Sequence, residues 1–162
     1  MQSKVPGPAQ QVETVIDAVL SASRVLVAVA ARSLSDVAEE VTLTQYRTLI
    51  VLASRGPQNL AGLAEAVGVT PATATRMCDR LVKKELIARS AEPDDRRHVR
   101  LALTRKGLAL VSKVTKRRRL EIESIVKAIA PGERATLVQA LSRFAAAAGE
   151  VPEQDWSTGW DL

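Results

Sequence analysis

Residues 59–80, NLAGLAEAVGVTPATATRMCDR, predict two short helices joined by a tight turn. Asn59 can cap the first helix, and Gly68 can adopt the left-handed conformation that ends it. Thr70 can cap the second helix, in which Pro71 suits the first position because proline has no backbone N–H to leave unpaired. The stretch therefore predicts a helix-turn-helix.

The second of these helices has two chemically different faces when its positions are spaced at 3.6 residues per turn. Its apolar face comprises Ala74, Met77, Cys78 and Leu81. Its other face comprises Ala72, Thr73, Thr75, Arg76 and Arg80. Short side chains let a helix approach the floor of a DNA major groove, and Arg76 can donate two hydrogen bonds to a guanine edge. The alternative for this window alone is a solvated helix face with ordinary positive charges.

A change of period from 3.6 to two follows this helix and predicts a β-hairpin. Residues 99–103 alternate in the manner of a strand, and residues 86–91 supply its partner. The connecting sequence EPDDRRH carries Arg96 and Arg97 at its tip. A thin arginine-tipped hairpin can enter a narrow minor groove, where the negative potential is deepest. Its place directly after the helix-turn-helix favours such a wing over the alternative, a self-neutralising surface turn.

Helical patterns flank this unit on both sides. Thr44 is expected to cap the helix before the helix-turn-helix, and Thr104 is expected to cap a long helix after the hairpin. The second helix of the helix-turn-helix is expected to continue to Glu85. We expect a flexible lead at 1–9, an N-terminal dimerisation helix at 10–38, a DNA-binding lobe at 42–104, C-terminal dimerisation helices at 105–149 and a tail at 150–162.

The N-terminal helix has a wider apolar stripe than a lone surface helix needs, which indicates a second partner such as another chain. We do not expect it to span a bilayer, because Asp17, Arg24 and Arg32 interrupt it. The first ten residues lack an apolar signal core, and the single cysteine, Cys78, cannot form an internal disulfide. Cys78 is interpreted as a small buried thiol rather than a reactive one. These features predict a cytoplasmic protein with no membrane partner.

Positive charge is concentrated in the middle of the chain. Residues 70–120 hold 15 Lys and Arg against 5 acids, a net charge of +10, whereas the remaining residues hold 8 against 13, a net charge of −5. This distribution is typical of a nucleic-acid-binding region between pairing elements. The run at 116–119 is interpreted as a solvated flank, with phosphate contact as the alternative. The tail has two tryptophans and four acids and is expected to pack on the body or against a partner.

Three segments in this order resemble the MarR family of bacterial winged helix-turn-helix regulators. They are LTQYRTLIVLASRGP, LAGLAEAVGVTPATATRMCDRLVKKELI and DDRRHVRLALTRKG, and by motif the resemblance runs from Val41 to Gly107. The last segment places Asp95, Arg97, Leu103 and Thr104 in the family's wing pattern. The resemblance implies a mainly α fold with a small β-hairpin wing, in the α+β class. It also implies N- and C-terminal dimerisation helices.

A homodimer on a near-palindromic operator of double-stranded DNA is the functional state that the resemblance implies. Such regulators usually repress transcription and are often released by a small phenolic or anionic effector. Arg80 would contact phosphate, and Arg97, held by Asp95, would read DNA at the wing tip. The residues expected to bind DNA are Thr70, Ala72, Thr73, Thr75, Arg76, Arg80, Asp95, Arg96 and Arg97.

This sequence departs from the family pattern at two places, which bear on how it would recognise DNA and on whether it would sense peroxide. Pro71 and Ala72 replace more polar residues at the start of the recognition helix, so DNA shape should contribute more to specificity. The cysteine of the peroxide-sensing branch is absent from the first helix. Arg24, Tyr46 and Arg47 are candidates for the border of an effector cavity, with a core tyrosine and surface arginines as the alternative.

The alternatives to a DNA-binding regulator are an enzyme and a protein-binding adaptor. The sequence argues against an enzyme and predicts no cofactor or metal: His98 is the only histidine, and neither a GxxxxGK[ST] phosphate loop nor a GxSxG elbow is present. A winged-fold adaptor that binds a protein is the second class. It predicts only a gentle response of binding to salt, unlike a protein that neutralises DNA phosphates.

Overall fold

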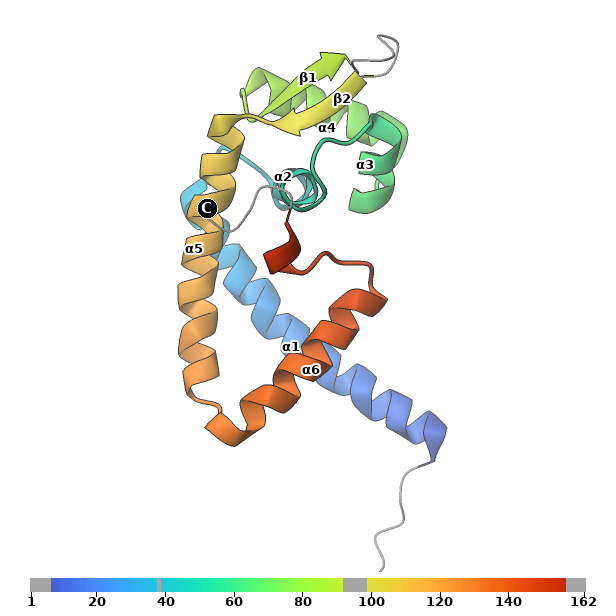
Figure 1. Ribbon diagram of the computed structural model, residues 1–162, viewed down its shortest axis with the longest axis vertical. Helices are drawn as coiled ribbons and strands as arrows, with labels where there is room; N and C mark the ends of the chain where they lie inside the picture. The colour runs from blue at the N-terminus through green and yellow to red at the C-terminus, as the bar shows by residue number, and fades with distance from the viewer. Residues whose placement is uncertain (1–6, 38, 92–98, 157–162) are drawn as a thin grey trace, which may run out of the picture.

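The computed structural model describes residues 7–37, 39–91 and 99–156. Figure 1 shows the short helices and the hairpin gathered at one end of the molecule, with the long helices making up the rest of it. The elements in chain order are α1 (Pro8–Leu34), η1 (Ser35–Val37), α2 (Leu43–Arg55), α3 (Leu60–Val67), α4 (Pro71–Lys83), β1 (Ile87–Ala91), β2 (Val99–Leu103), α5 (Arg105–Lys127), α6 (Pro131–Ala147) and η2 (Glu153–Asp155). The mainly helical fold with one hairpin, expected from the sequence, is confirmed.

The helix-turn-helix forms through the local bonds that its sequence predicts. The Asn59 side chain accepts a hydrogen bond from the backbone N–H of Gly62 at 2.8 Å. Gly68 ends α3 with φ of +76°, a left-handed conformation that most residues with a side chain avoid. The Thr70 hydroxyl then accepts a bond from the Thr73 N–H at 3.2 Å and begins α4.

Helix α2 begins two residues earlier than the sequence predicted. Its cap is Thr42, whose hydroxyl accepts from the Gln45 N–H at 3.2 Å while the Gln45 side chain accepts from the Thr42 N–H at 3.0 Å. This reciprocal pair satisfies two backbone donors at once, which a cap at Thr44 could not do. Thr44 lies inside the helix, and its carbonyl accepts from the Thr48 hydroxyl at 3.0 Å.

The core lies between α2, α3, α4, α5 and the hairpin. The predicted inward face of α4 is confirmed, since Ala74, Met77, Cys78 and Leu81 are all buried. Leu49, Leu52 and Leu63 are also buried, and each contributes roughly 1.5–3 kcal/mol to folding. Burial raises the pKa of the Cys78 thiol, which disfavours the reactive thiolate. This agrees with the interpretation of Cys78 as a packing residue.

The hairpin is a two-stranded antiparallel ladder in which Ile87 faces Leu103 and Arg89 faces Leu101. Gln58, between α2 and α3, adds a third short pairing that the sequence did not predict. Its N–H donates to the Leu101 carbonyl at 3.0 Å, and its carbonyl accepts from the Leu101 N–H at 2.8 Å. The hairpin is therefore held at its centre by the helix-turn-helix. Asp95, Arg96 and Arg97 lie outside the described residues.

A close backbone contact joins the hairpin to α5. Helix α4 ends at Lys83, earlier than predicted, because Glu85 adopts a left-handed φ of 61° and turns the chain into the hairpin. The Thr104 hydroxyl donates to the Glu85 carbonyl at 2.6 Å and caps α5 by accepting from the Gly107 N–H at 3.0 Å. Gly107 passes so close to Leu86 that a Cβ on it would lie 2.0 Å from the Leu86 carbonyl oxygen.

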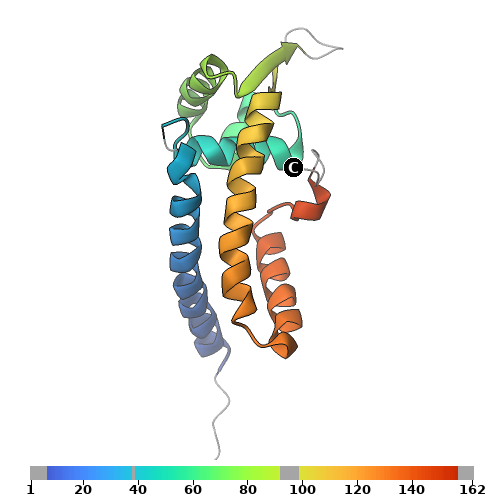
Figure 2. The same ribbon diagram turned by 90° about the vertical axis from the view of Figure 1, so that its left-hand side faces the viewer.

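Helices α1 and α6 leave much apolar surface uncovered. Helix α1 runs beside α5 (Figure 2) and pairs with it through Arg32 and Glu121 at 2.7 Å. Helix α6 has no buried residue. Apolar patches of this extent usually mark interaction surfaces. The large apolar residues exposed by 44–62% on the two helices are Val12, Val15, Ile16, Leu20, Val25, Leu26, Val138, Leu141 and Phe144.

The N-terminal helical segment also meets the length and composition of a membrane span. Over Ala9–Val37 its mean hydropathy reaches 1.8, so in these terms alone it is apolar and long enough to cross a bilayer. From the sequence, Asp17, Arg24 and Arg32 were expected to keep this helix from spanning a bilayer. A single such helix near the N-terminus is weak evidence for a membrane, because helices that pair with other helices have the same composition.

Candidate nucleic-acid interface and effector cavity

The outer face of α4 carries the side chains that the sequence assigned to DNA. Thr70, Ala72 and Thr75 are exposed, and Thr73 is half-buried. Arg76 and Arg80 are exposed farther along the same helix. Because the opposite face is buried in the core, α4 cannot rotate, and this face remains turned to solvent. The described residues thus bring six of the nine predicted DNA-binding residues onto one helix and its cap.

Local hydrogen bonds limit what these side chains can donate to a base. The Thr75 hydroxyl donates to the Pro71 carbonyl at 2.9 Å, and the Thr70 hydroxyl donates to the Thr73 oxygen at 3.0 Å. The Arg76 Nη2 lies 3.4 Å from the same Thr73 oxygen, a long contact that leaves its other N–H groups available. Arg76 can therefore still donate to a base edge from this face.

Several basic residues counted in the charge analysis make bonds within the protein. Arg89 on β1 pairs with Asp79 on α4 at 2.5 Å, which ties the hairpin to the helix. Lys84 donates to the Glu40 carbonyl, and Lys106 donates to the Lys84 carbonyl at 3.0 Å. The positive charge available to DNA is accordingly smaller than the count over residues 70–120 suggested.

Three arginines of the basic run on α5, Arg117, Arg118 and Arg119, contact other parts of the protein. Arg117 pairs with Asp36, and Arg119 pairs with Glu153 at 3.1 Å. The Arg118 guanidinium lies 5.6 Å from the centre of the Tyr46 ring, a cation–π geometry. The run keeps much of the exposure expected of a solvated flank, and its arginines also make contacts within the protein that the sequence did not predict.

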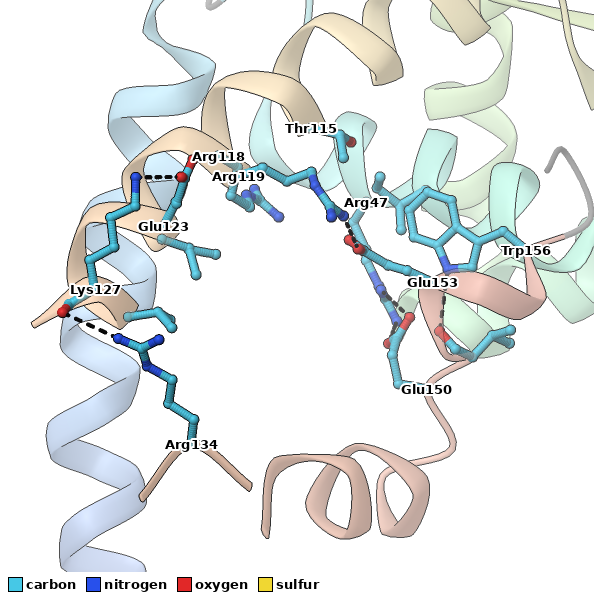
Figure 3. A pocket seen from close by; sticks show the side chains of 14 residues that line it. Arg47, Thr115, Arg118, Arg119, Glu123, Lys127, Arg134, Glu150, Glu153 and Trp156 are labelled. Carbon is cyan, nitrogen blue, oxygen red and sulfur yellow. Dashed lines mark hydrogen bonds and ion pairs between the residues drawn. The ribbon is translucent and has the colours of Figure 1, made fainter. Parts of the chain in front are cut away.

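This cavity lies between α2, α5, the start of α6 and the tail, and has a volume of about 780 Å³ (Figure 3). Ile122, Val126 and Trp156 are among its apolar lining residues, and Arg47, Arg118 and Arg119 are among its cations. The Arg118 Nε is buried and has no hydrogen-bond partner in the described part of the chain. An unpaired buried N–H costs roughly 1–3 kcal/mol, so the site favours an acceptor.

The three residues predicted to border an effector cavity separate in the structure. Arg47 lines the cavity, and Tyr46 is buried beneath Arg118 with its hydroxyl 3.4 Å from that of Thr115. Burial raises the pKa of the Tyr46 phenol, which keeps it protonated. Arg24 does not line the cavity, because it lies on α1 and donates to Ser21 at 3.1 Å.

Sequence reasoning missed the residues that complete this cavity. Arg118 and Arg119 come from the basic run, whereas Glu150, Glu153 and Trp156 come from the acidic tail. The opposite charges of these two segments were the available signal that they meet. Within the described residues, no group of three or more side chains is arranged to hold a metal ion.

Comparison with known proteins agrees with this geometry. Residues 41–99 match the model of the MarR family. The chain is 33% identical over 105 residues to the HTH-type transcriptional repressor NicR of Pseudomonas putida, an alignment that covers 65% of this chain and 66% of NicR. A second relative, an HTH-type transcriptional regulator of Bacillus subtilis, is 38% identical, and the aligned part of this chain covers 48% of its length. The chain thus spans about half to two thirds of these relatives.

Two solved structures extend the comparison over most of the chain. The crystal structure of RV1404 from Mycobacterium tuberculosis is 46% identical in sequence, with a TM-score of 0.80 over 91% of this chain and 99% of that one. BpsR of Bordetella bronchiseptica, whose DNA binding is regulated by 6-hydroxynicotinic acid, is 27% identical, with a TM-score of 0.61 over 82% and 98%. With its motifs, its winged helix-turn-helix fold and these identities in agreement, the chain belongs to the MarR family of transcriptional regulators.

Proposed function

We propose that this protein is a homodimeric repressor that binds a near-palindromic operator in double-stranded DNA. The observation that carries the proposal is the fixed outer face of α4, which presents short side chains followed by Arg76 while its opposite face is locked in the core. A helix of this kind can lie in a major groove with its arginine against a guanine edge. Repression is supported by the name of the relative NicR.

Two copies would be joined through the arms formed by α1, α5 and α6. The exposed apolar residues of α1 and α6 support this arrangement, since a surface of that composition gains free energy when a second copy covers it. We propose that the functional parts are a DNA-binding lobe at 42–104 and dimerisation arms at 10–38 and 105–149.

A regulator that acts on chromosomal DNA would be cytoplasmic.

The cavity between α2 and α5 is our candidate for the effector site. Its arginines suit a carboxylate, and its isoleucine, valine and tryptophan side chains suit an aromatic ring. The regulation of BpsR by 6-hydroxynicotinic acid, a ring with a carboxylate, supports this class of ligand. Arg47 and Tyr46 belong to this proposed site, whereas Arg24 does not.

The salt dependence of binding tests the DNA proposal. We expect fluorescence anisotropy with a duplex from the neighbouring intergenic region to give an affinity that falls steeply with salt. The log-log slope should be about −0.9 for each phosphate that the protein neutralises. Binding that barely responds to salt, or that requires no DNA, would favour the protein-binding adaptor instead.

Replacing Arg76 by alanine tests the assignment of a base contact. We expect the preference for operator over random duplex to fall by about 1–3 kcal/mol, because the variant loses its main donor to a base edge. Arg143→Ala is the matched control, since Arg143 is exposed on α6, away from the α4 face. If Arg76→Ala weakens both duplexes equally, Arg76 contacts phosphate and does not read sequence.

A further inference from the structure

The C-terminal tail returns from α6 to the DNA-binding lobe. Helix α6 ends at Ala147, and Gly149, with a φ of +71°, then turns the chain. The N–H of Glu150 donates back to the Ala145 carbonyl at 3.0 Å. Because α6 has no buried residue of its own, the segment after it makes the contacts that tie its end to the body. We call residues 149–156 the tail segment.

The tail segment is held at the cavity by arginines from two helices. On α2, Arg47 makes two bonds to the Glu150 carboxylate, at 3.0 and 2.6 Å, and Arg55 donates to the Gly149 carbonyl at 3.0 Å. On α5, Arg119 pairs with Glu153 at 3.1 Å. Figure 3 shows both carboxylates turned toward these guanidinium groups. The Glu150 and Glu153 carboxylates thus form ion pairs with the same arginines that an anionic ligand would need.

Trp156 completes this attachment from the apolar side. Its ring packs against the core of the lobe, and its Nε1 donates to the Val151 carbonyl at 3.3 Å. The indole also lines the cavity. A ring and two carboxylates on one segment therefore present the chemical groups of an aromatic acid to the site.

We propose that the tail segment is a built-in competitor for the cavity, and that an aromatic carboxylate binds there by displacing it. The proposal rests on the effector site proposed above and adds the regulation of that site. Displacement would transfer Arg47 and Arg119 from the tail to the ligand and would offer an acceptor to the unpaired Arg118 Nε. It would also free the end of α6 from α2, which changes how the arm holds the DNA-binding lobe.

The strength of the contacts permits such an exchange. The paired side chains are 37–58% exposed, and partly exposed ion pairs contribute little net stability. A ligand that makes the same pairs loses little by breaking those of the tail. It gains the bond to Arg118, which none of the described carboxylates supplies.

Trp156 fluorescence provides a direct test in a Trp160→Phe background, where it is the sole tryptophan. Benzoate is the probe, and benzamide is its neutral counterpart of equal shape. We expect benzoate to shift the Trp156 emission to longer wavelength and to make it more accessible to iodide, while benzamide leaves both unchanged. In a Glu150→Gln/Glu153→Gln variant the emission should be shifted before ligand is added, and half-saturation should need about fivefold to tenfold less benzoate.

Glu123→Gln supplies the control for charge. Glu123 lines the same cavity but pairs with Lys127 on its own helix at 2.6 Å and does not hold the tail. It should leave Trp156 emission unchanged and lower the benzoate requirement less than the double variant does. The proposal is rejected if benzoate leaves Trp156 emission unchanged or if benzamide shifts it as much as benzoate does. It is also rejected if Glu123→Gln lowers the benzoate concentration at half-saturation as much as the double variant does. These readouts need no DNA, so they can fail while operator binding succeeds, and the reverse also holds.

Discussion

A Gly107→Ala variant is expected to lose about 3 kcal/mol of unfolding free energy, the upper end of what overpacking usually costs. The added Cβ would lie 2.0 Å from the Leu86 carbonyl oxygen and 3.1 Å from a methyl carbon of Leu103. That carbonyl cannot move freely, because it already accepts the Thr104 N–H at 3.1 Å. Either α5 or the base of the hairpin must shift. Urea denaturation followed by circular dichroism measures the loss.

Gly132→Ala is the matched control for this substitution. Gly132 lies in the first turn of α6, and a Cβ added there meets no atom within 4 Å. Alanine at an open helical position is expected to be neutral or to stabilise by about 0.5–1 kcal/mol. Equal denaturation midpoints for the two variants would show that the junction tolerates a side chain, contrary to our account of it.

The second large effect is expected from Leu20→Asp combined with Leu141→Asp. These leucines are 53% and 52% exposed on α1 and α6, and in the proposed dimer both would face the second copy. Aspartates buried in an apolar interface lose their hydration without compensation, so we expect a monomer. Because a monomer would bind only one half-site of the operator, operator affinity should fall by about a hundredfold or more. Sedimentation velocity and anisotropy measure the two effects.

Leu43→Asp separates loss of pairing from a general effect of added charge. Leu43 is 61% exposed but lies at the start of α2, outside the proposed arms. We expect this variant to keep the dimeric mass and, within a few fold, the operator affinity. A double variant that stays dimeric would place the contact between copies elsewhere. One that becomes monomeric yet binds as tightly would refute the need for two recognition helices.

Local bonding explains why much of the lobe could be predicted. The caps at Asn59 and Thr70, and the left-handed Gly68, depend on atoms only a few residues apart, so their residue types reveal them. The two faces of α4 follow equally from helical spacing. Thr44 was the wrong cap because two threonines compete near the start of α2, and the Gln45 side chain selects Thr42.

The cavity could not be found in this way. Arg47 and Glu150 are 103 residues apart in the chain, and no helical or strand period relates positions at such a separation. Whether the Arg118 Nε finds a hydrogen-bond partner depends on which residues the fold packs around it, and amino-acid composition does not reveal them. Arg24 was grouped with Tyr46 and Arg47 by residue type alone, whereas α1 places it elsewhere.

By itself, the sequence determined that a helix-turn-helix with a short-chained, arginine-bearing face is followed by a two-stranded hairpin, because hydrogen bonds within a few residues and the burial of one helix face specify both. Only the tertiary structure decided that α5 passes Leu86 at a distance that admits no side chain at Gly107, and that the acidic tail segment meets arginines of α2 and α5. These contacts join distant parts of the chain and exist only after the core has brought the helices together.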